Sequence, residues 1–162
     1  MLLQSLDGLF VDIEVSSYQF GLGQSRTDLA DWDANWLMIH GRVWDGVESW
    51  EFLDPCMTTW EARELAVWLR GLGSGHPATT APTDPEDAGM WLTEPNLEFR
   101  LAAASEGITT LDVDFGAESR PPGCSSEDHE GLGHRVRLTI PQIEIDRAVS
   151  EWEADLRAFP PR

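Results

Sequence analysis

The sequence has no lysine, and its eleven arginines stand against 29 aspartates and glutamates, so the formal net charge is −18 at pH 7. This lack of positive charge argues against nucleic acid as a partner, because phosphate binding depends on clustered Lys and Arg side chains. It also argues against binding to anionic membrane surfaces. A basic protein would be attracted, most strongly at low salt. The alternative is that the acidity only maintains solubility or reflects the proteome of the host.

Cysteine is also scarce, with Cys56 and Cys124 the two that occur. Two thiols do not make a disulfide framework in a chain of 162 residues, which favours a reducing compartment. The first residues show no basic segment followed by a long apolar one, so no signal peptide is indicated. No apolar run approaches the ~20 residues that span a bilayer. We therefore expect a cytoplasmic protein with no membrane association.

Motifs that carry catalysis or cofactor binding are missing. The sequence contains no HExxH, GxSxG or GxGxxG pattern, and its four histidines show no zinc-ligand spacing. With 29 acids, any carboxylate pair chosen as a catalytic dyad would be arbitrary. We expect no enzyme activity, no cofactor and no metal.

One segment begins like a calcium-binding loop, with Asp31, Asp33 and Asn35 at alternate positions. The pattern then fails, because Trp36 stands where such a loop needs Gly and Arg42 where it needs a bidentate Glu. The favoured interpretation is that these polar residues cap and turn the chain before a strand, with neighbouring tryptophans packed beneath.

Cys56 precedes an expected helix start by one or two residues, where a helix dipole can lower the pKa of a thiol. A cysteine enzyme would also need a positioned histidine, which the sequence cannot place. Free cysteine is among the most buried residue types, so a structural, buried Cys56 is favoured. Whether Cys56 or Cys124 is reactive stays open.

Alternating apolar residues predict most of the strands. The hydrophobic fraction of 41% suits one domain over residues 1–162. In the first half we expect a strand over 9–15, then a hairpin of strands 36–44 and 47–53 joined by a turn at Asp45-Gly46. A helix should begin at Thr58, where Thr58 and Glu61 have the spacing of a capping box, and end near Gly71.

The second half repeats this hairpin pattern. We expect strands over 90–93, 97–101 and 111–115, a turn at Glu106-Gly107, a strand over 136–140 and a helix after Pro141. Residues 71–89 and 116–133 are rich in Gly, Pro and Ser and are expected to be loops. The predicted fold class is α+β, a mainly antiparallel sheet of about six to seven strands built from hairpins, with two helices packed on it.

Acidic residues on the outward positions of the predicted strands are candidates for partner binding. Asp12 and Glu14 alternate with core positions of one strand, and Asp112 and Asp114 do so in another. Like charges on one sheet face are unfavourable unless a cationic surface compensates them. The alternative is that the strands lie apart and the acids are simply solvated. Further candidates are Asp31, Asp33 and the segment 127–130.

Several segments together resemble a known family. They are Asp31–Leu37, Trp50–Cys56, Thr58–Ala62, Trp68-Leu69, Glu94–Leu97 and the end of the chain from Trp152-Glu153 to Phe159-Pro160. These segments are similar to the WapI-type immunity proteins of bacteria, which protect a cell against the C-terminal toxin of a WapA-like protein. The similarity runs from Leu9 to Pro160, outside the two loops.

The resemblance implies a non-enzymatic protein that binds and blocks a cognate secreted or contact-dependent toxin, in the best-known case a nuclease acting on tRNA. A nuclease must be basic to hold phosphate, so an acidic inhibitor would be attracted to it. The main alternative is a small-molecule-binding or regulatory domain with a pocket on the sheet face, and an enzyme with an unrecognised site is a third. The sequence does not determine the oligomeric state.

Overall fold

The structure is a computed structural model that describes residues 1–21, 32–72, 89–123 and 133–162. Strands β1 (Leu2–Gln4), β2 (Phe10–Tyr18), β3 (Trp36–Trp44) and β4 (Ser49–Thr58) form sheet A in that order. Strands β5 (Gly89–Trp91), β6 (Leu97–Ser105), β7 (Ile108–Phe115) and β8 (His134–Pro141) form sheet B. The helices are α1 (Thr59–Leu72) and α2 (Gln142–Asp155), with short 3₁₀ turns η1 (Asp33–Asn35), η3 (Ala117–Ser119) and η4 (Leu156–Ala158).

The predicted α+β class with antiparallel hairpins and two helices is confirmed. The strands are divided between two sheets, however, and the described residues contain eight of them. The additional strand is β1, which pairs with β2 through Leu3 opposite Val11. Three residues are too few to show an alternation, so the sequence did not reveal this strand.

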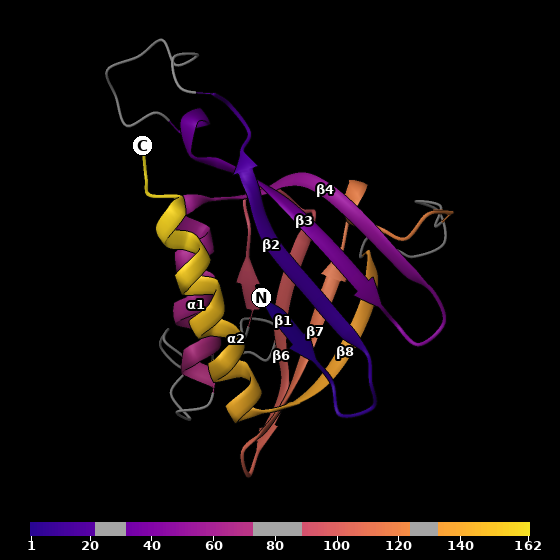
Figure 1. Cartoon of the computed structure of the whole chain (residues 1–162). Helices are drawn as coiled ribbons and strands as arrows, with labels where there is room; N and C mark the ends of the chain where they lie inside the picture. Colours follow the sequence, from indigo (N-terminus) through magenta and orange to yellow (C-terminus); the bar gives the residue numbers. More distant parts are fainter. Residues whose placement is uncertain (22–31, 73–88, 124–132) are drawn as a thin grey trace.

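The two sheets lie face to face, and both helices lie together on one side of them (Figure 1). Helix α1 contacts β4, and α2 contacts β1, β2 and β8. The helices are joined where the indole N–H of Trp152 donates to the carbonyl of Ala62 at 2.8 Å. At another edge the chain after β1 reaches β8, where the backbone N–H of Leu6 donates to Thr139 O at 2.9 Å. No helix in the described part of the chain is long and apolar enough to cross a membrane.

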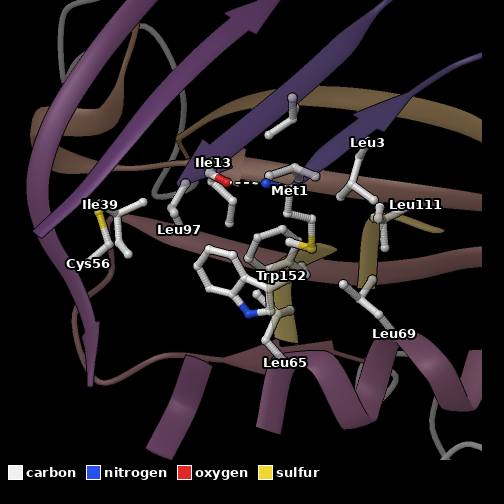
Figure 2. Packing of buried hydrophobic residues seen from close by; sticks show 14 of the residues in the cluster. Met1, Leu3, Ile13, Ile39, Cys56, Leu65, Leu69, Leu97, Leu111 and Trp152 are labelled. Atoms are coloured by element: carbon white, nitrogen blue, oxygen red, sulfur yellow. Dashed lines mark hydrogen bonds between the residues drawn. The ribbon is translucent and has the colours of Figure 1, made fainter. Parts of the chain in front are cut away.

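The inner faces of both sheets form a shared hydrophobic core with the helices. Figure 2 shows Met1, together with Leu3 and Ile13 of sheet A, beside Leu111 of sheet B, with Trp152 and Leu65 from the helices. The amino group of Met1 donates to Ile13 O at 2.6 Å. Most apolar positions predicted from alternation are buried, among them Val11, Leu37, Ile39, Val43, Phe99, Val113, Phe115, Val136, Leu138 and Ile140, whereas Leu9, Val15 and Leu101 are partly buried against the core. Alternation therefore identified the core faces correctly.

Both predicted hairpin turns occur, with one change in detail. At the second, Glu106 and Gly107 both have positive φ, 47° and 79°, as a tight two-residue hairpin requires. At the first, Gly46 has φ 95° and Val47 is the other central residue, because the backbone N–H of Asp45 bonds to Glu48 O. The turn is thus shifted by one residue from Asp45-Gly46. Asp45 instead accepts hydrogen bonds from the N–H groups of Val47 and Glu48, both at 2.8 Å.

The predicted capping box at the start of α1 is confirmed. The Glu61 carboxylate accepts the backbone N–H of Thr58 at 2.7 Å, and the Thr58 hydroxyl accepts the N–H of Glu61 at 3.3 Å. The other oxygen of Glu61 accepts the N–H of Thr93 at 2.6 Å, so the cap also holds the connection between β5 and β6. The helix continues to Leu72, one residue past the expected stop at Gly71.

Trp50 joins the two sheets. Its ring packs edge-on against Phe115 of β7 and His134 of β8, with ring centroids 5.3 Å apart in each case. Its indole N–H donates to Ser119 O at 2.9 Å, which satisfies the polar atom of a side chain that is only 4% exposed. The neighbouring Phe52 lies over Gly41, where an added Cβ would come within 2.1 Å of the ring. Sheet A therefore needs glycine at this position.

We predict that Trp50→Ala lowers the free energy of unfolding by about 3–5 kcal/mol, because it leaves a cavity between the sheets. Thr58→Ala should lower it by only about 1 kcal/mol, through the lost cap. Urea titration followed by tryptophan fluorescence and circular dichroism measures both. The control is Trp91→Ala, since Trp91 is 54% exposed and should cost clearly less than Trp50. Equal and small losses for Trp50 and Thr58 would contradict these roles.

Candidate partner-binding surfaces

The candidate acids of β2 lie on the outer face of sheet A, opposite the core. Asp12 is cross-strand partner to Arg42, and their side chains form an ion pair. The amino group of Met1 lies 3.7 Å from the same carboxylate. Asp12 is therefore compensated within the chain, and its side chain is 18% exposed.

Glu14 lies in a cluster of three titratable side chains on the same face. His40 Nδ1 is 2.9 Å from Glu14 Oε1, and His40 Nε2 is 3.2 Å from Glu51 Oε2. The hydrogen bonds to Glu14 and Glu51 raise the pKa of His40. The bond to His40 lowers the pKa of Glu14, against a smaller opposing effect of burial. One imidazole thus lies between two carboxylates, and these are 58% and 68% exposed.

The candidate acids of β7 lie on the outer face of sheet B and are enclosed by arginines. Arg137 binds Asp112 through Nε and Nη2 at 2.7 and 2.8 Å, and Arg135 binds Asp114 through the same atoms at 2.7 and 3.1 Å. Arg100 from β6 also contacts Asp114. Both aspartates face away from the core as predicted, yet they are only 5% and 4% exposed. The hydrogen bond from Arg137 holds the pKa of Asp112 below its usual value, although burial opposes this.

The two pairs of acids therefore belong to different sheets and do not share one face. We expected a cationic partner because the acidic side chains were predicted to lie together on one sheet face. That expectation took no account of the arginines on neighbouring strands. In the structure, arginines of neighbouring strands already compensate Asp12, Asp112 and Asp114. These arginines could have been anticipated, since Arg135 and Arg137 alternate with the buried Val136 and Leu138.

The remaining candidate acids are placed only in part. Asp31 and residues 127–130 lie outside the described residues, and Asp33 opens the short turn η1 before β3. Asn35 is buried, with its side-chain oxygen accepting from Thr59 Oγ1 and from the backbone N–H of Arg162, both at 2.9 Å. This agrees with a structural role for the calcium-like segment. Trp36 is buried beneath it as predicted, whereas Trp32 is 53% exposed and packs against Trp60.

The potentially reactive side chains have structural surroundings. Cys56 is fully buried on β4, as favoured from the sequence, and burial raises the pKa of its thiol to about 12. His134 contacts Asp45 at 2.8 Å and so ties the first hairpin turn to β8. Burial acts to raise the pKa of Asp45, but the N–H groups of Glu48 and Val47, together with His134, lower it on balance. Cys124, His76 and His129 lie outside the described residues.

The described ranges contain no group of three His, Cys, Asp or Glu side chains that could hold a metal ion. A groove of about 220 Å³ lies between the two helices, lined by Arg63, Ala66, Val67, Glu153, Leu156 and Arg157. It lies on the helical side of the molecule and not on a sheet face.

Comparison with known proteins adds a decisive finding, since the model of the immunity protein WapI-like family matches residues 1–160. The chain belongs to the WapI-like immunity protein family. No curated protein and no solved structure matches it. Membership in this family supports an immunity role carried out by protein binding and favours a non-enzymatic protein.

We predict that Asp112→Asn in this WapI-like protein lowers the free energy of unfolding at pH 7 by about 1.5–3 kcal/mol, because the charged hydrogen bonds with Arg137 are weakened. The contribution of a carboxylate with a lowered pKa is present above its ordinary pKa of 3.8 and is lost as the pH falls below it. The difference from wild type should therefore shrink in urea titrations below that pH. The exposed Asp7→Asn is the control, and an effect of similar size there would contradict a specific ion pair.

A second prediction concerns the pH dependence of the Glu14–His40–Glu51 cluster. Because the pKa of His40 is raised in the folded state, the protonated imidazole contributes to the free energy of unfolding below pH 6.5. This contribution is lost as the pH rises through the folded-state pKa. Because the pKa of Glu14 is lowered, its ionised carboxylate contributes to the stability of the fold above pH 4.5. His40→Gln should therefore cost most stability between pH 4.5 and 6.5 and less at higher pH. Unfolding measured over this pH series tests the prediction, and a pH-independent difference would be evidence against it.

Proposed function

We propose that this protein binds and neutralises a cognate secreted or contact-dependent bacterial toxin, and that the toxin is a basic nuclease. The observation that carries the proposal is the match of residues 1–160 to the WapI-like immunity protein family. The mode of action is a stoichiometric complex in which the toxin cannot reach its substrate. The immunity protein itself carries out no reaction.

The charge of the chain supports a basic partner. A nuclease needs clustered arginines and lysines to hold phosphate, and those side chains attract a protein with a net charge of −18. The attraction extends over a Debye length, about 8 Å at physiological salt, and so speeds encounter before contact. Rapid association matters for an inhibitor that must act before the toxin reaches its substrate.

The chemistry of the described residues is in keeping with inhibition by binding. The thiol of Cys56 is buried and its pKa is raised to about 12, so it is not a nucleophile at neutral pH. The groove between α1 and α2, at about 220 Å³, is smaller than ligand pockets of about 300–1,000 Å³.

The test uses the C-terminal domain of the cognate toxin, which is to be sought among the genes that adjoin that of this protein. We predict that co-expression restores growth of cells that produce the toxin domain. One equivalent of purified protein should abolish RNA or DNA cleavage by the domain, and the two should elute as one complex in size-exclusion chromatography. Increasing salt should slow association. A toxin domain that kills and cleaves equally well with and without this protein would refute the proposal.

A further inference from the structure

The outer faces of the two sheets carry similar numbers of acids but differ in how these are compensated. On sheet B, the ion-paired side chains are Arg100, Arg135 and Arg137 with Glu98, Asp112 and Asp114, three of each sign. On sheet A, Asp12, Glu14 and Glu51 contact one arginine, Arg42, one histidine, His40, and the buried amino group of Met1. While His40 is neutral, sheet A therefore carries one more negative than positive charge in this cluster, whereas sheet B is balanced.

The outer face of sheet B is poorly suited to receive a cationic side chain. Its two aspartates are at most 5% exposed, and each is bound by an arginine through two hydrogen bonds. A lysine or arginine of a partner would have to displace these hydrogen bonds. The free energy lost with them offsets the free energy gained from the new hydrogen bonds to the partner. The surface that a partner meets here includes Arg135, 37% exposed, and Arg137, 61% exposed, together with Trp91 of β5, which is 54% exposed beneath Arg100.

The outer face of sheet A has the opposite character. Glu14 and Glu51 are more than half exposed, and both contact the same imidazole. Even a protonated His40 carries one positive charge, so it cannot neutralise both carboxylates. In the register of the sheet Glu14 and Leu53 are the two cross-strand neighbours of His40, and Leu53 is 57% exposed. The exposed apolar side chain of Leu53 thus lies near the exposed carboxylates of Glu14 and Glu51. Protein interfaces combine apolar and polar contacts in this way.

In the described part of the chain, no helix or strand covers this face. Both helices lie to one side of the two sheets, and sheet B lies behind sheet A (Figure 1). The strands β2, β3 and β4 therefore present their outward side chains over a rigid, hydrogen-bonded surface. Rigid presentation lowers the entropic cost of binding.

We infer that the outer face of sheet A, centred on Glu14, His40, Glu51 and Leu53, is the surface that binds the basic face of the toxin. This inference rests on the proposed function. A lysine or arginine of the toxin contacts the solvent-exposed side of the Glu14 and Glu51 carboxylates beside His40, and an apolar side chain covers Leu53. The Asp112 and Asp114 pair stabilises sheet B and makes no contact with the toxin.

The arrangement also makes binding sensitive to pH. The charged groups facing His40 are Glu14 from β2 and Glu51 from β4, while Arg42 on its own strand is engaged by Asp12. When His40 is protonated, its positive charge partly neutralises Glu14 and Glu51. The two carboxylates then attract a cation of the toxin less strongly. Acidification through the pKa of His40 therefore weakens the complex, and His40→Gln removes this dependence.

The experiment measures association and dissociation of the toxin domain with wild type and with the double variant E14Q/E51Q at low and physiological salt. The control is E64Q/E151Q, which changes net charge equally but at exposed positions on α1 and α2. We expect E14Q/E51Q to slow association about tenfold at low salt and to flatten the salt dependence. The control variant should change the association rate by less than about twofold. L53A should instead speed dissociation.

The outcomes separate the two proposals. If wild type binds and protects but E14Q/E51Q binds equally well, this surface is wrong and the proposed function stands. If the control loses as much as E14Q/E51Q, only net charge matters and the surface is again refuted. If wild type forms no complex, the proposed function fails and this inference falls with it. Circular dichroism and urea titration verify that each variant is folded.

Discussion

The constraint on which the structure depends is that two separate sheets bury their inner faces in one core. Trp50 fills the space between them, against Phe115 and His134, and its indole N–H reaches Ser119. Helices α1 and α2 pack on the same core from one side, with Trp152 between them. Once the inner faces are committed to the core, every charged residue on the strands must point outward or lie at an edge.

This constraint explains why the surface differs between the sheets. The pleat places Asp12 and Glu14 outward on β2, and it places Asp112 and Asp114 outward on β7 by the same rule. What surrounds them depends on the neighbouring strands. Strand β7 lies between β6 and β8, whose outward residues include three arginines that close over both aspartates. Strand β2 lies beside β3, which offers Arg42 to Asp12 but only His40 to Glu14. Of the four acids predicted as equivalent, Asp12, Asp112 and Asp114 are thereby paired with arginines, and only Glu14 is more than half exposed.

Carboxylates inside the fold are likewise paired with hydrogen-bond donors of other elements. Glu61 is nearly buried, and its carboxylate is satisfied by Thr58 at the start of α1 and by Thr93 before β6. Burial alone would raise its pKa, but the backbone N–H groups of Thr58 and Thr93 lower it on balance. A local capping motif has thus become a tertiary link between the helix and sheet B. Asp45 does the same for the first hairpin, which it connects to His134 of β8.

The sequence by itself determined the local features, because these depend on residues close together in the chain. Period-two alternation identified the core-facing side of β2, β3, β4, β6, β7 and β8, and the Thr58–Glu61 spacing located the start of α1. Family resemblance, confirmed over residues 1–160, indicated the role. Alternation says which side chains share a face, but not which strands are neighbours. The division into two sheets, the arginines over Asp112 and Asp114, and the single histidine between Glu14 and Glu51 were therefore decided only by the tertiary structure. Each of these depends on strand order and cross-strand register, which bring together residues far apart in the chain.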